Sequence, residues 1–82
     1  MMNVHEFNSL SLALKKEALS GGTFLMDHLT DDHYVKLYSL DSFYVEVYFD
    51  DSTHRITIIR AFKSTMYLQP YLNWLTVSVG LD

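Results

Sequence analysis

The chain has 82 residues, of which 49% are hydrophobic and 15% aromatic, and it carries a formal net charge of −4 with no cysteine. This composition fits a single domain, 1–82, with large core side chains, and it excludes a disordered chain and a disulfide framework. The negative charge without a basic stripe argues against nucleic acid as a partner, the apolar runs are too short to enter a membrane as a span, and a cytoplasmic protein is expected.

The first expected element is one amphipathic helix near the start of the chain. Its apolar residues follow helical spacing and leave the charged residues on the other side. Asn3 or Ser9 can cap its start, and Gly21-Gly22 ends it because glycine adopts the left-handed cap conformation at little cost. The apolar stripe consists of Phe7, Leu10, Leu14 and Ala18, widened by Leu12 and Leu19.

The segment 23–29 is ambiguous between a short helix and an edge strand, since Phe24-Leu25-Met26 suits either. A strand is favoured, because Thr30-Asp31-Asp32 is a credible turn into the segment that follows. The two segments are then expected to form a hairpin.

Residues 34–50 predict the central hairpin of an antiparallel sheet, because side chains of two kinds alternate along its second half. A three-residue loop over 40–42 sets Leu37 opposite Val45 and gathers the aliphatic side chains on one face. A two-residue turn instead sets Leu37 against Glu46 and mixes the two faces. The longer loop is therefore favoured.

The segment 54–62 is rich in β-branched residues and predicts a fourth strand after a polar turn. A simple four-residue loop would point Arg60 into the core and turn Ile59 and Ala61 outward. A bulge near Ile59 would correct both faults, and one is predicted there.

The last expected element is a short helix from about Leu68 to Leu75, with Pro70 in its first turn. The sequence therefore predicts a two-layer α+β fold with an N-terminal helix, a four-stranded antiparallel meander and a short C-terminal helix. Both helices are expected on one face of the sheet, because only the aliphatic face matches their apolar stripes.

Several short segments of the chain resemble a family of short bacterial proteins that has no assigned activity. They are Gly22-Thr23-Phe24-Leu25, Leu37-Tyr38-Ser39-Leu40, Phe43-Tyr44-Val45-Glu46-Val47, Ile59-Arg60-Ala61-Phe62-Lys63-Ser64 and Pro70-Tyr71-Leu72. The resemblance covers most of the chain, supports a strand at Thr23 and implies nothing about function.

The outward face of the predicted sheet carries tyrosines and polar residues that neither helix is expected to cover. A large aromatic patch typically marks an interface, so the chain is expected to be a protein-interaction module that forms a homodimer or binds another protein. The competing interpretation is that tyrosines merely suit strands and cover the sheet with their rings. The predicted interface consists of Tyr34, Lys36, Tyr38, Tyr44, Glu46, Tyr48, Arg55 and Thr57.

Histidine and aspartate residues gather at one end of the predicted sheet, and such side chains can together hold a divalent ion. Their spacing matches no tight metal motif, and the predicted register separates His33 from His54 by two strand spacings, about 9.6 Å. No metal and no cofactor are therefore expected. The residues considered are His28, His33, His54, Asp27, Asp31, Asp32, Asp50 and Asp51.

The opposite end of the predicted sheet offers an alternative site, with Arg60 and Lys63 beside Ser64. Free backbone N–H groups at an expected helix start would favour a small anion there, so a small-ligand-binding domain is the alternative function. The competing interpretation is that these basic residues are solvated or pair with a carboxylate. No enzyme is expected, because the chain has neither a nucleophile elbow nor a glycine-rich phosphate loop.

Overall fold

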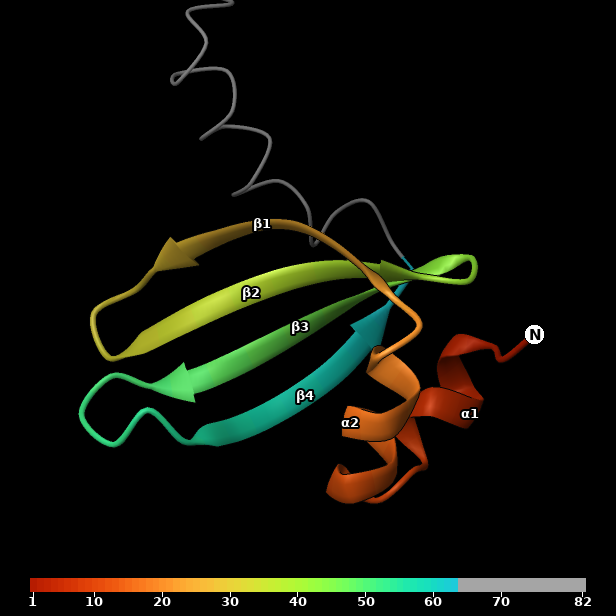
Figure 1. Cartoon of the computed structure of the whole chain (residues 1–82), viewed down its shortest axis with the longest axis horizontal. Coiled ribbons are helices and arrows are strands. Elements are labelled where there is room, and N and C mark those ends of the chain that lie inside the picture. The colour runs from red at the N-terminus through yellow and green to blue at the C-terminus, as the bar shows by residue number, and fades with distance from the viewer. Residues whose placement is uncertain (64–82) are drawn as a thin grey trace, which may run out of the picture.

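The computed structural model describes residues 1–63, which form two short helices followed by a four-stranded sheet (Figure 1). The strands are antiparallel neighbours in chain order, β1-β2-β3-β4, so the predicted α+β meander is confirmed. The predicted C-terminal helix at Leu68 to Leu75 lies outside the described residues. The elements are α1 (Val4–Asn8), α2 (Leu12–Leu19), β1 (Thr23–Leu29), β2 (His33–Leu40), β3 (Phe43–Asp50) and β4 (Ile56–Phe62).

The N-terminal segment forms two helices, and the prediction of one continuous helix is wrong. Asn3 caps α1 through a capping box with Glu6, in which each side chain accepts the other residue's backbone N–H. Ser9 ends this helix, and its hydroxyl donates to the Glu6 carbonyl at 2.8 Å. Ser11 then starts α2 by accepting the backbone N–H of Leu14. Serines compete well for backbone groups, so two of them this close interrupt the helix.

The central hairpin is confirmed, but its predicted register is wrong. The turn between β2 and β3 has two residues, and Leu37 lies opposite Glu46. Asp41 has a φ of 52°, the positive value that both favoured two-residue hairpin turns require at their first central residue. Its carboxylate also accepts the backbone N–H of Met2 at 2.9 Å, which ties the turn to the start of the chain.

The register of β4 is irregular near Thr57, close to the predicted bulge. Tyr48 pairs with Ile58 whereas the next residue, Phe49, pairs with Ile56, so Thr57 is the extra residue. Beyond this irregularity Ile59 is 2% exposed and lies in the core. The predicted effect of the bulge is therefore confirmed, since Arg60 turns to the other side of the sheet.

The sheet buries side chains on both of its faces. We call the side that packs against α1 and α2 the helix face, where Phe7 is fully buried among sheet residues. On the opposite face Val35, Leu37 and Glu46 are at most 5% exposed. The helix face carries Tyr34, Lys36, Tyr38, Leu40, Phe43, Val45, Val47, Phe49, Ile59 and Ala61. The opposite face carries Val35, Leu37, Tyr44, Glu46, Tyr48, Ile58, Arg60 and Phe62.

Candidate protein-binding groove on the helix face

The structure separates the residues of the predicted tyrosine interface. Tyr34, Lys36 and Tyr38 lie on the helix face, and Tyr44, Glu46 and Tyr48 lie on the opposite face. Thr57 is the irregular residue of β4, and Arg55 lies in the turn that precedes this strand. The shift of one residue in the hairpin register causes this separation, because neighbouring residues of a strand point to opposite sides. A single face with all four sheet tyrosines therefore does not exist.

A hollow of about 450 Å³ lies between α2 and the helix face of the sheet. The helices cover only part of this face, since α1 and α2 gather beside the end of β4 in Figure 1. The floor of the hollow is apolar, and its rim includes a lysine from α2. The lining consists of Phe24, Tyr38, Val47, Phe49, Ile56 and Ile59 from the sheet with Lys16, Leu19, Ser20 and Gly22 from the helical side.

A second hollow of about 420 Å³ continues toward the far end of the sheet. It is lined by Leu29, Tyr34, Lys36, Phe49, Asp51 and His54. Phe49 lines both hollows, so the two adjoin, and we call the pair the aromatic groove. Phe24 and Leu29 border it from β1 and are 51% and 71% exposed, respectively. Such neighbouring exposed apolar side chains are typical of a surface that another molecule covers.

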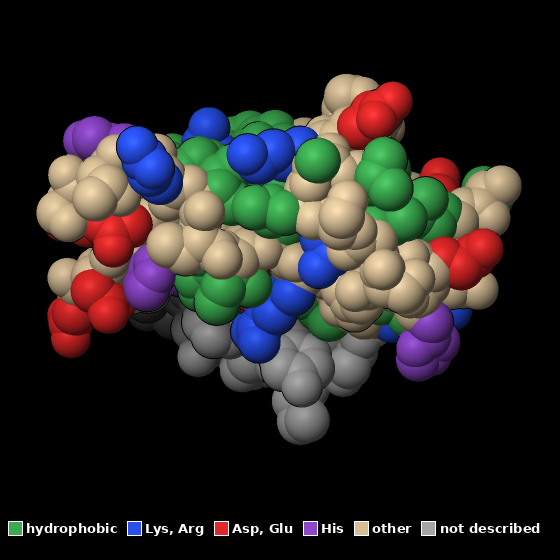
Figure 2. All heavy atoms as spheres, turned by 90° about the horizontal axis from the view of Figure 1, so that it is seen from below, with side chains coloured by type: hydrophobic (Ala, Val, Ile, Leu, Met, Phe, Trp, Pro, Cys, Tyr) green, Lys and Arg blue, Asp and Glu red, His purple; other side chains and the backbone are tan. Residues whose placement is uncertain are grey.

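Two lysines line the aromatic groove, one in each hollow, and the carboxylate of Asp51 lines the second hollow as well. The Lys36 ammonium lies 5.3 Å from the ring centre of Phe49 and 5.9 Å from that of Tyr34, within the range of a cation–π contact. Lys16 lies at the rim of the first hollow. Within residues 1–63 neither lysine has a carboxylate within 4.0 Å. In the view of Figure 2, hydrophobic side chains lie exposed among Lys and Arg side chains along the middle of the molecule.

Tyr34 is held in place by Asp27, whose carboxylate accepts the phenol hydrogen bond. This hydrogen bond raises the pKa of Tyr34 above its ordinary value, and the negative charge of Asp27 adds to the effect. The ring of Tyr34 also packs against that of Phe49, with centroids 5.9 Å apart. One wall of the groove is therefore formed by an aromatic side chain with a fixed orientation.

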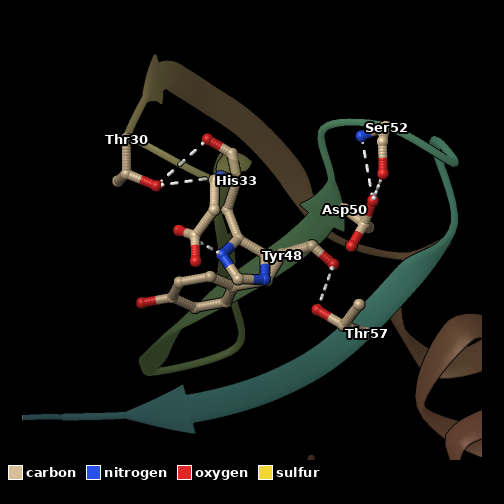
Figure 3. Close-up of polar contacts among 7 residues, drawn as sticks. Thr30, His33, Tyr48, Asp50, Ser52 and Thr57 are labelled. Carbon is tan, nitrogen blue, oxygen red and sulfur yellow. Dashed lines mark hydrogen bonds and ion pairs between the residues drawn. The ribbon is translucent and has the colours of Figure 1, made fainter.

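The histidine and aspartate residues at the end of the sheet make hydrogen bonds that are typical of turns (Figure 3). Thr30 Oγ1 accepts the backbone N–H of His33, whose ring contacts Asp32 at 3.0 Å. Asp50 accepts three hydrogen bonds from Ser52 and Thr53, which lower its pKa to about 2. Among the described residues no three histidine, aspartate or glutamate side chains are placed to share a metal ion.

Arg60 and Lys63, the described members of the predicted ligand site, line a hollow of about 300 Å³ beside α1. Ser64 lies outside the described residues. The Arg60 guanidinium pairs with the buried Glu46 carboxylate at 3.0 Å and contacts the Tyr48 hydroxyl at 3.4 Å. Burial raises the pKa of Tyr48, with a further contribution from Glu46. The basic side chain of Arg60 therefore serves a structural contact on the opposite face.

Most of the groove residues were not predicted as part of a site, because the apolar side chains of the central hairpin were expected in the core and the charged side chains of the N-terminal helix on its other side. A usable signal was the density of aromatic side chains in β3, where Tyr44, Tyr48 and Phe49 are only partly buried. No protein-family model matches the chain, and comparisons with curated proteins and with solved structures find no match either. Neither of the two helices in residues 1–63 has the length and apolar composition needed to cross a lipid bilayer.

Proposed function

We propose that this protein is an interaction module that binds a segment of another protein in the aromatic groove. The observation that carries the proposal is the groove itself, an apolar depression left open between α2 and the sheet. Ligand-binding surfaces typically combine apolar and aromatic walls with a few placed polar groups, and the groove has this make-up. An open shape suits a chain segment better than a small molecule, which needs to be enclosed on most sides.

The charges of the groove indicate the chemistry of the bound segment. Lys16 and Lys36 lie at the two hollows and have no carboxylate partner within the described residues. A segment with apolar side chains and one or two carboxylates would match both the walls and the lysines. A basic segment would meet two like charges there, whereas the protein as a whole has a net charge of −4. The two lysines therefore favour a carboxylate of the partner at each of these positions, although the overall charge of the protein is negative.

Small-anion binding near Arg60 has less support. The guanidinium already pairs with Glu46, and an incoming anion would compete with a carboxylate that is 5% exposed. Releasing a buried carboxylate from its charged partner is costly, so an anion would gain little net free energy there.

A selection from phage-displayed random peptides tests the proposal without a known partner. We expect enriched peptides to share apolar residues and carboxylates, and to bind at least about tenfold more weakly to Phe24→Ser and to Lys36→Glu, a loss of about 1.4 kcal/mol. Ile58→Ser is the matched control, because Ile58 is 48% exposed on the opposite face and Phe24 is 51% exposed. Lys63→Glu controls for the change of charge. Peptides whose binding ignores Phe24 and Lys36, or no enrichment at all, would refute the proposal.

A further inference from the structure

The two edges of the sheet differ in how their backbone groups are occupied. At the β4 edge, the Asn8 side chain donates to the Ala61 carbonyl at 2.9 Å and accepts the Ala61 N–H at 2.8 Å. The Lys15 ammonium donates to the Ile59 carbonyl at 3.0 Å. Side chains from both helices thus take the place of a neighbouring strand. This edge is closed against the addition of another strand.

The β1 edge has no comparable side-chain cover within residues 1–63. Thr30 donates its backbone N–H to the His33 carbonyl at 2.8 Å, so the backbone N–H and C=O groups of His33 point toward β1. Backbone hydrogen-bonding groups of successive residues in an antiparallel strand point alternately to its two sides, so those of Tyr34 and Lys36 point toward β3. Their partners on β1, Leu29 and Asp27, therefore direct N–H and C=O groups away from the sheet.

Three of the exposed apolar side chains of residues 1–63 lie in this same strand. Phe24, Leu25 and Leu29 are 51%, 45% and 71% exposed. The register shifts between Phe24 and Met26, so the regular open part of the edge runs from Met26 to Leu29. An edge with free backbone groups and exposed apolar side chains is a template for another strand.

The charges at the two ends of β1 identify which strand fits this edge. Lys16 shares a hollow with Phe24, at the start of the strand. Asp31 and Asp32 follow its other end, and both residues are exposed. One end of the edge is therefore basic and the other acidic. A second copy of the same edge, running antiparallel, brings opposite charges together at both ends.

We propose that two copies of this protein pair through their β1 strands, antiparallel and around a two-fold axis perpendicular to the sheet. A register centred on His28 sets Asp27 of one copy opposite Leu29 of the other, so the outward backbone groups of both residues are paired. It also sets Asp32 of one copy opposite Phe24 of the other, close to Lys16. The pairing joins both sheets into one and leaves the helix faces on the same side. Phe24, Leu29 and Lys16 belong to both proposals, but the pairing uses the backbone edge of β1 and the function proposed for the aromatic groove uses side chains on the helix face.

Light scattering over a concentration series, combined with a matched pair of variants, tests the pairing. Asp27→Pro removes an outward N–H from β1, whereas Asp27→Ala removes the same side chain and keeps the N–H. We expect a dimer for the original chain, a dissociation constant raised at least about tenfold in Asp27→Pro, and a smaller change in Asp27→Ala. A thermal unfolding scan of each variant checks that the domain remains folded.

A charge reversal provides the second arm of the test. Asp31→Lys combined with Asp32→Lys should weaken the dimer, and adding Lys16→Glu should restore part of the lost affinity, because the ends become complementary again with exchanged signs. Higher salt should weaken the dimer of the original chain through screening. A monomer at every concentration overturns the proposal, and so does a dimer that ignores Asp27→Pro and the charge reversal. Asp27→Pro and Asp27→Ala both lose the hydrogen bond to Tyr34. Peptide binding in the groove should therefore be equal in the two variants while dimerisation differs, which separates the two proposals.

Discussion

Replacing Phe7 by alanine should detach the helices from the sheet, because this side chain is their main anchor. Phe7 is 0% exposed, and its ring lies 5.7 Å from that of Phe43. Helix α1 has five residues, far fewer than an isolated helix needs to be stable in water. Its position therefore depends on burial of this one ring together with its cap and polar contacts.

The size of the effect follows from the burial. Truncating a fully buried phenylalanine to alanine costs about 3–5 kcal/mol, including the cavity that remains. A short helix at the margin of the domain can partly close that cavity, so we expect the lower end, about 3 kcal/mol. A folded chain of 82 residues typically has a free energy of unfolding of about 4–12 kcal/mol. Phe7→Ala should therefore remove a large fraction of the stability.

Urea denaturation followed by circular dichroism measures this loss directly. Phe7→Leu is the control, since it keeps most of the apolar contact and should cost about 1–2 kcal/mol. Phe7→Ala should also weaken peptide binding, because α2 forms one wall of the groove. A loss below about 1 kcal/mol in Phe7→Ala would show that the helices are not held to the sheet by this ring.

Three further changes test local features of the structure. His54 has a φ of 61°, so His54→Gly should raise the free energy of unfolding by up to about 1 kcal/mol in urea denaturation. Asn8→Ala should lower it by about 1–3 kcal/mol by leaving the Ala61 backbone groups unpaired, whereas Ser9→Ala should change it little. In the folded protein the pKa of Asp50 is lowered from 3.8 to about 2. Its contribution to the free energy of unfolding is therefore present above about pH 4 and is lost as the pH falls toward 2. Asp50→Asn should remove this part of the acid dependence, which unfolding measurements between these pH values would detect.

The sequence predicted the strands more reliably than the way they pair. Alternation and β-branched residues identify the segments of β2, β3 and β4, and the turn at 30–32 correctly favoured a strand for β1. The predicted register of the central hairpin was wrong because it assumed that only one face of the sheet is buried. Val35 and Leu37 are buried on the face opposite Val45 and Val47, so apolar side chains on both faces were required.

The candidate site was predicted only in part, for the same reason. Tyr34, Lys36 and Tyr38 belong to the groove, but they were predicted to share a face with the tyrosines of β3. The structure pairs Lys36 with Val47, because the long apolar stem of a lysine can lie over a valine while its ammonium stays wet. Alternation along one strand cannot reveal this behaviour. The contribution of α2 to the groove depends on the break in the helix at Ser9 and Ser11. The stripe of apolar residues in the sequence does not indicate this break.

The most direct test of the groove is an NMR titration of isotope-labelled protein with a peptide from the selection. Binding in the groove should produce chemical-shift changes that cluster at Phe24, Tyr34, Lys36 and Phe49, around both hollows. Changes that cluster instead on the opposite face, around Tyr44 to Tyr48 and Arg60, would contradict it. That result would assign binding to the other half of the predicted tyrosine interface and leave the groove without a role.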